Sequence, residues 1–294
     1  MEVDGLVGSL SKLVDKYGSI LILLPALVWV FLFLVIPVAL LASISFFTPM
    51  RGGGYTTTLT FENYLSIFSS PYYLRILLST LRLCGEIVAI CLVLAYPAAY
   101  FLVFKVRSDR VRMLLFFSLI VLFFIDWSIR TIAWYPVLSV QGLVSTLAVS
   151  WGLIPEPRTF MFSEATLILV WIQSYIVFMM SPIYLSMLKI NPNLIDVAQT
   201  LGASRAKAFY HVVFKMSLPG IIIGCMFVFI MAIADYATPK LIGGGMVTIG
   251  SVVVELTATL FWPTAAALSI IIMAITMAFI YLLLKIVDIR RMLF

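Results

Sequence analysis

Residue types that commonly carry out covalent or metal chemistry are sparse in this sequence. It contains a single histidine, His211, and three cysteines, Cys84, Cys91 and Cys225, which lie in apolar runs without a C-x-x-C spacing. A metal centre needs several clustered ligands, and we interpret the cysteines as small buried hydrophobic residues. We therefore predict no catalytic residue and no metal site in this chain. Charged side chains that could bind a solute become the main candidates.

Charged residues interrupt two long apolar runs. Arg82 and Glu86 are four residues apart, as are Asp126 and Arg130, so each pair can meet on one face of a helix. A charge inside the hydrocarbon of a membrane is costly, and it usually faces a bundle interior or a water-filled path. The simpler interpretation is that each pair only lowers the cost of insertion, and we favour that interpretation for Arg82 and Glu86.

Two acidic residues, Asp126 and Asp235, occur in aromatic surroundings. A carboxylate flanked by aromatic rings suits an organic ammonium ion, through ion pairing and cation–π contact. The alternative is that these rings only mark the membrane interface, where Trp and Tyr are enriched. Arg130 could also meet an anionic group, which leaves a zwitterionic solute open. The predicted substrate-path residues are Asp126, Trp127, Arg130, Tyr135, Trp171, Tyr175, Asp235 and Tyr236.

These substrate-path residues require a set of membrane-spanning elements to position them, and the amino-acid composition indicates a membrane protein. Hydrophobic residues make up 63% of the 294-residue chain and charged residues only 11%, against roughly 25% charged residues in soluble domains. About 20 apolar residues suffice to cross the hydrocarbon core as a helix. We predict an all-α integral membrane protein, and expect an additional helix over 140–153 at the outer interface, ending near Gly152. The six expected transmembrane helices are 19–47, 73–104, 113–135, 165–188, 218–237 and 263–287.

The distribution of positive charge predicts the orientation of these helices. Most of the 19 Lys and Arg residues fall before the first span, after the second and fourth spans, and after the sixth. Basic residues concentrate in cytoplasmic loops, so the net charge of +6 needs no nucleic-acid partner to explain it. We predict a cytoplasmic tail at 1–18, a permease domain at 19–287 and a second cytoplasmic tail at 288–294.

One cytoplasmic segment, 191–216, differs from the other loops. Leu194, Val197, Ala198 and Leu201 recur with the spacing of one helix face. Asn193 is a candidate to cap the start of this short helix, Gly202 to end it in the left-handed conformation, and Ser204 to cap a second helix. A helix of two turns is marginal alone in water, so its apolar face is expected to lie in the groove of a partner. An ordinary surface helix, packed against this chain's own loops, is the alternative.

This elbow resembles the E-A-A-x-x-x-G loop of permeases in binding-protein-dependent ATP-binding-cassette (ABC) importers. Asp196, Val197 and Ala198 stand at the positions of the acidic residue and the two alanines, with Asp in place of Glu and Val in place of the first Ala. The resemblance implies a type I importer permease whose elbow docks on an ATPase subunit and transmits its closure. The implied coupling residues are Asp196, Val197, Ala198, Leu201, Gly202 and Ala203.

Several further segments resemble the first (B-type) permease subunit of spermidine/putrescine importers. They are Leu-Thr-Phe-Glu-Asn-Tyr at 59–64, Cys-Leu-Val-Leu-Ala-Tyr-Pro-Ala-Ala-Tyr-Phe at 91–101, Ser-Ile-Arg-Thr at 128–131, Leu-Gly-Ala-Ser at 201–204 and Leu-Pro-Gly-Ile at 218–221. The resemblance implies import of a small, cationic, polyamine-like solute across the bacterial inner membrane. Relatives that carry aminoethylphosphonate, an opine or amino-acid derivative, or ferric iron share much of the pattern.

The resemblance also implies partners. The sequence contains no G-x-x-x-x-G-K-[ST] phosphate loop, so we expect ATP and Mg²⁺ to bind a separate ATPase dimer and this chain to hold no cofactor. A second, non-identical permease subunit and an extracytoplasmic binding protein would complete the complex. A membrane-embedded enzyme is disfavoured because its clustered acids and histidines are missing. A channel or an ion-gradient-driven transporter would leave the elbow unexplained.

Overall fold

The computed structural model describes residues 23–50 and 52–286. The predicted tails 1–18 and 288–294 therefore lie outside the described residues. Within the described part, helices dominate and two short antiparallel strands, β1 and β2, form a hairpin. The elements are η1 (Phe31–Val35), α2 (Ile36–Ile44), β1 (Phe47–Pro49), β2 (Tyr55–Leu59), α3 (Glu62–Ser69), α4 (Pro71–Phe104), α5 (Asp109–Val121), η2 (Leu122–Phe124), α6 (Trp127–Ile132), α7 (Tyr135–Leu138), α8 (Leu143–Ser150), α9 (Glu164–Leu188), α10 (Asn193–Thr200), α11 (Arg205–Ala208), η3 (Phe209–Phe214), α12 (Lys215–Ala234), α13 (Ala237–Ile242), α14 (Ile249–Ala258) and α15 (Trp262–Ile286).

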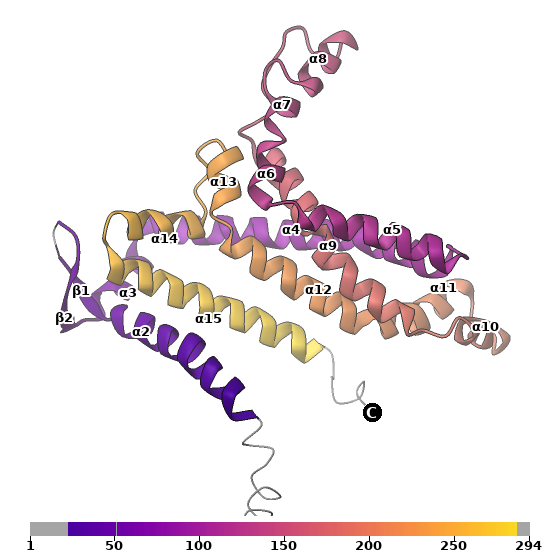
Figure 1. Cartoon of the computed structure of the whole chain (residues 1–294), viewed down its shortest axis with the longest axis horizontal. Coiled ribbons are helices and arrows are strands. Elements are labelled where there is room, and N and C mark those ends of the chain that lie inside the picture. Colours follow the sequence, from indigo (N-terminus) through magenta and orange to yellow (C-terminus); the bar gives the residue numbers. More distant parts are fainter. Residues whose placement is uncertain (1–22, 51, 287–294) are drawn as a thin grey trace, which may run out of the picture.

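The core is formed by three long helices, α4, α9 and α12, which pack against one another (Figure 1). Small residues on α12 permit a close approach to α9. A Cβ atom added to Gly220 would lie 2.4 Å from the carbonyl oxygen of Pro182, and one added to Gly224 would lie 2.8 Å from the sulfur of Met179. Such contacts are typical of membrane helices, whose association depends on close packing because lipid is as apolar as the side chains. The close packing of α9 against α12 therefore depends on the absence of side chains at these two glycines.

Among the described residues, six helical segments have the length and apolar composition needed to cross a membrane. This result confirms the predicted helical membrane fold with six candidate spans, but the third of them, Trp127–Ser150, differs from the predicted 113–135. Many large apolar side chains of the segment Leu23–Ile44 and of α15 remain exposed, as expected of surfaces that meet lipid or another membrane subunit. In Figure 1, α2 and α15 lie together along one side of the bundle. The six segments are Leu23–Ile44, Pro71–Phe104, Trp127–Ser150, Glu164–Leu188, Arg205–Ala234 and Trp262–Lys285.

The predicted third span, 113–135, is wrong as one continuous helix. The chain leaves the α5 helix through the 3₁₀ turn η2, becomes extended at Ile125, and starts α6 with Asp126 as the N-cap. The first part belongs to the bundle, because Phe116 stacks on Tyr184 and Phe123 packs edge-on against Phe178 of α9. The second part joins α7 and α8 in an arm that leaves the bundle (Figure 1).

The arm also contains the helix expected over 140–153. That helix is α8, which ends at Ser150 and is followed by Trp151 and by Gly152 in the left-handed region, with φ of 71°. A glycine just after a helix end is a common stop signal, because the left-handed conformation costs it little. The predicted end near Gly152 is confirmed.

Candidate functional site

The elbow 191–216 forms the sharp helix–glycine–helix turn that its sequence predicts. α10 ends at Thr200, Gly202 adopts φ of +90°, and the Ser204 side chain accepts a hydrogen bond of 3.3 Å from the Lys207 N–H at the start of α11. α11 continues through the π-helical turn η3 into α12. The elbow is thus joined by continuous helix to a core helix of the bundle, so a displacement of α11 can be passed to α12.

The start of the elbow differs from the prediction that Asn193 caps α10. Asn193 is instead the first residue of the helix and Pro192 is the N-cap. The Asn191 side chain accepts a hydrogen bond of 3.0 Å from the Asn193 N–H, so it takes over the capping contact from outside the helix. The reason is the proline, whose fixed φ suits the first turn and moves the helix start by one residue.

The apolar face of α10 is not covered by this chain. Leu194, Val197 and Leu201 are 42%, 53% and 84% exposed, whereas Ile195 packs against the hydrophobic core. This pattern disfavours the interpretation of α10 as an ordinary surface helix with its apolar face turned inward. Asp196 and Gly202 lie exposed beside the same face, whereas Ala198 and Ala203 are half-buried.

A second polar centre forms around Asp235, at the C-terminal end of α12. Its Oδ2 atom accepts hydrogen bonds of 2.8 Å from both the Trp171 Nε1–H and the Tyr175 hydroxyl. Trp171 is fully buried and Tyr175 nearly so. The aromatic pair on α9 thus meets the α12 carboxylate, as their one-face spacing allows. Buried indole and phenol groups need such partners.

The other carboxylate oxygen of Asp235 organises the chain that follows. Its Oδ1 atom accepts hydrogen bonds of 3.0 Å from the N–H groups of Ala237 and Thr238, which caps the start of α13. The Thr248 hydroxyl donates to the Asp235 carbonyl at 3.3 Å and also caps α14. Asp235 therefore holds α9, α12, α13 and α14 together at one point, and both of its carboxylate oxygens have partners.

Four of the remaining predicted residues, Asp126, Trp127, Arg130 and Tyr135, lie on the arm, whereas Tyr236 follows Asp235 as the N-cap of α13. Asp126 accepts a hydrogen bond of 2.9 Å from the Ser128 N–H, and no ion pair joins it to Arg130 within the described residues. The pairing that their i, i+4 spacing allows is therefore not formed, because Asp126 is used as a helix cap. Arg130 has a buried Nε atom without a hydrogen-bond partner among the described residues.

The arm is attached close to the Asp235 centre. The Tyr135 hydroxyl donates to the carbonyl of Leu241 in α13 at 2.6 Å, and the Trp134 Nε1–H donates to the side-chain oxygen of Gln173 in α9 at 2.6 Å. Trp127 and Tyr236 are both largely exposed. The structure thus gathers Trp171, Tyr175 and Asp235 into one buried cluster, and places the other predicted path residues around it.

Arg82 and Glu86 form the predicted i, i+4 pair, with 3.6 Å between Arg82 Nε and Glu86 Oε1. A shorter contact of 2.6 Å joins Arg82 Nη2 to Glu164 Oε1 at the start of α9. Glu164 was not among the predicted residues, and neither were Gln173 and Thr248. Only a contact between distant segments identifies them, since each stands alone in its own sequence window.

The architecture defines a class of protein. A bundle of membrane-length helices with a glycine elbow projecting beyond one end is the fold of an ABC importer permease. The chain aligns with a bacterial ABC transporter involved in the import of the acidic polysaccharide alginate at a TM-score of 0.73, covering 95% of this chain and 98% of that one with 19% identity. A second alginate transporter structure, in complex with a pentasaccharide-bound periplasmic protein, aligns at 0.72.

Sequence comparison identifies the family. The chain belongs to the family of spermidine/putrescine transport system permease proteins. It is 32% identical to PotB of Escherichia coli over 244 residues, which cover 82% of this chain and 88% of that protein. It is 30% identical to PotB of Haemophilus influenzae, with 82% and 84% covered, and 25% identical to the inner membrane ABC transporter permease protein YdcU of E. coli, with 76% of each covered. No family model matches the chain.

Proposed function

We propose that this chain is the permease subunit through which an ATP-driven importer moves a polyamine-like cation across the inner membrane. The observation that carries the proposal is the similarity to PotB proteins over most of both chains. The exposed apolar face of α10 supports the ATP-driven part of the proposal. An uncovered face of this kind, on a helix too short to be stable alone, suits docking on a partner.

The complex that we propose contains four further subunits. Two ATPase subunits bind ATP and Mg²⁺, and a second, non-identical permease subunit and an extracytoplasmic binding protein complete the assembly. The partial match to a PotC homologue of Mycoplasma genitalium, at 36% identity over 69 residues, supports a second permease of related sequence. The positive charge in alternate loops supports an orientation with both termini in the cytoplasm.

In this proposal the elbow is the coupling element. Asp196, Val197, Ala198, Leu201, Gly202 and Ala203 contact the ATPase, and closure of the ATPase pair upon ATP binding displaces α11. Because α11, η3 and α12 form one continuous helical segment, the displacement reaches the bundle. The spans then change from an inward-open to an outward-open arrangement.

The Asp235 centre has a positioning role in this proposal. Trp171 and Tyr175 occupy one carboxylate oxygen and the α13 cap occupies the other, so little of the carboxylate is left for a solute. Asp126, Trp127, Arg130, Tyr135 and Tyr236 would then line the outer approach to the path. A cationic solute is favoured over alginate, because the alginate transporters share the fold at only 19% identity.

The test is ATP hydrolysis by the purified assembly in lipid, with its binding protein and a panel of solutes. The panel contains putrescine, spermidine, aminoethylphosphonate, an opine and ferric iron. Stimulation by a polyamine alone is the expected result. Stimulation by another solute would keep the importer but assign it that solute in place of a polyamine. Transport by vesicles that contain only this chain would overturn the importer proposal in favour of a channel or secondary transporter.

A further inference from the structure

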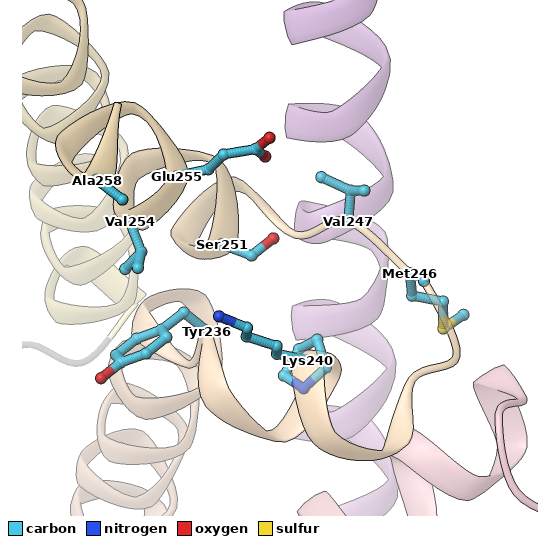
Figure 2. A pocket seen from close by; sticks show the side chains of 10 residues that line it. Tyr236, Lys240, Met246, Val247, Ser251, Val254, Glu255 and Ala258 are labelled. Carbon is cyan, nitrogen blue, oxygen red and sulfur yellow. The ribbon is translucent and has the colours of Figure 1, made fainter. Parts of the chain in front are cut away.

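A cavity of about 340 Å³ lies in the hairpin that α13 and α14 form after the Asp235 centre. Figure 2 shows Tyr236 and Lys240 on the α13 side, Ser251, Val254 and Glu255 on the α14 side, and Met246 and Val247 in the connection. Its size falls within the range of small-molecule sites. None of its lining residues except Tyr236 belongs to the predicted substrate path.

The hairpin is held in a fixed shape by the groups already described. Asp235 caps α13 and receives the Thr248 hydroxyl through its carbonyl, while the Ile249 N–H donates to the Thr80 hydroxyl of α4 at 3.0 Å. The connection turns at Gly244 and Gly245, both in the left-handed region. A Cβ atom added to Gly244 would lie 2.3 Å from the Cβ of Phe162. The cavity is therefore a built feature of the fold.

Two opposite charges line the cavity without pairing. Within the described residues, neither Lys240 nor Glu255 takes part in an ion pair. In Figure 2 their charged heads point in different directions, the Glu255 carboxylate toward α4 and the Lys240 amine toward Tyr236. Apolar side chains of Met246, Val247 and Val254 line the space with them. The lining thus offers the Glu255 carboxylate as a partner for one cation, apolar side chains along the wall, and the Lys240 amine, which repels a second cation.

We propose that this cavity is an outer subsite for an organic ammonium ion with an aliphatic chain, a statement that rests on the proposed function. Glu255 is the counter-ion of the bound ammonium, whereas the Tyr236 side chain lies next to the Lys240 amine. The alkyl chain lies along the apolar side chains, where its burial is favourable. Lys240 repels a second ammonium, so the site holds one end of a diamine and leaves the other end toward water.

Lys240 is the specificity-determining residue in this arrangement. It penalises a fully inserted diamine and favours a molecule of equal length that carries a carboxylate at its second end. Weak holding of the diamine suits a transport path, where a solute must leave as readily as it enters. An ω-amino acid of the same chain length as putrescine should therefore bind the wild-type cavity more tightly than putrescine does.

The direct test is protection of a cysteine placed in the cavity. Ser251→Cys in the assembled complex, without binding protein, is treated with a methanethiosulfonate reagent; the native cysteines are buried. Putrescine should slow the modification, a neutral diol of equal length should not, and Glu255→Gln should weaken protection about twofold to fivefold, because Glu255 is exposed and ion pairs open to water are weak. Lys240→Gln should strengthen protection by putrescine and weaken protection by the ω-amino acid.

Controls separate this inference from the proposed function. Glu156→Gln removes an exposed carboxylate outside the cavity lining, and it should leave protection unchanged. If the complex imports putrescine but putrescine does not protect Ser251→Cys, the subsite is refuted and the proposed function stands. If Glu255→Gln weakens docking of the binding protein instead of protection by putrescine, the cavity is a protein contact and the inference is overturned.

Discussion

The elbow and the Asp235 centre represent opposite ways of using polar and apolar groups. Around Asp235, one carboxylate satisfies two buried aromatic donors and caps a helix, so its contacts are complete within the chain. At the elbow, Val197 and Leu201 are left open to solvent. A polar group whose hydrogen bonds are all made within the chain has a structural role. Apolar side chains that remain exposed form a surface that a partner protein can cover.

The largest effect is expected from Asp235→Ala. The substitution leaves the buried Trp171 and Tyr175 donors without acceptors and removes the cap of α13, and each unsatisfied buried group costs about 1–3 kcal/mol. We expect a loss of roughly 3–5 kcal/mol in the free energy of unfolding on this basis, seen as poor recovery of the complex and a lowered Tm.

Asp235→Asn provides the milder comparison, because the side-chain amide keeps the shape of the acid and one acceptor oxygen, although it loses the charge and its NH2 group faces one of the two donor pairs. A variant that assembles and still imports polyamine would confirm the positioning role. A variant that assembles normally but no longer transports would show that the negative charge itself acts on the solute, contrary to the comparison above.

The second prediction concerns Gly202→Val. Nothing lies within 4 Å of a Cβ atom added there, so the cost comes from its φ of +90°, at about 1–2 kcal/mol for an L-residue in the left-handed region. The turn between α10 and α11 should open, and we expect normal membrane insertion with loss of substrate-stimulated ATP hydrolysis.

Gly152→Val is the control for backbone strain alone. Gly152 has φ of +71°, an equally open Cβ position, and a place on the arm after α8. Its substitution should leave the stimulation of ATP hydrolysis intact. Equal losses in both variants would mean that strain anywhere in the chain disables the complex, and the elbow would lose its special role.

The third prediction concerns Leu201→Asp on the uncovered face of α10. Leu201 is 84% exposed, so the free energy of unfolding should change by less than about 0.5 kcal/mol. Binding of the ATPase subunits, measured by their co-purification, should weaken at least tenfold if Leu201 is an apolar anchor worth about 1.4 kcal/mol or more. Leu153→Asp, at a similarly exposed leucine of the arm, should retain normal ATPase binding.

These elements also show what the sequence could predict. Long apolar runs identified the helices because crossing lipid imposes a length and a composition, and the spacing from Leu194 to Gly202 identified the elbow because it is local. The break at Ile125 was missed because the apolar run continues through it and the decisive signal is the single capping residue Asp126. The bond between Trp171 and Asp235 joins residues 64 positions apart, and no local pattern predicts such a contact.

The smallest effect is expected from Arg82→Gln. This variant tests whether a side chain whose charge is fully paired within the chain always contributes strongly to the stability of the complex. Arg82 contacts both Glu86 and Glu164, but its side chain is 55% exposed. We expect this end of α4 to face water rather than lipid. Ion pairs open to water contribute about 0–1 kcal/mol, so the Tm of the complex should fall by only a few degrees. Glu62→Gln, on an exposed acid of α3, gives the baseline for removing a charge.

A fall in Tm much larger than this baseline would show that Arg82, Glu86 and Glu164 become buried in the assembled complex. Breaking a buried ion pair leaves an uncompensated charge and costs about 3–5 kcal/mol. In that case the exposed face of α4 would belong with the elbow as a surface that a partner covers.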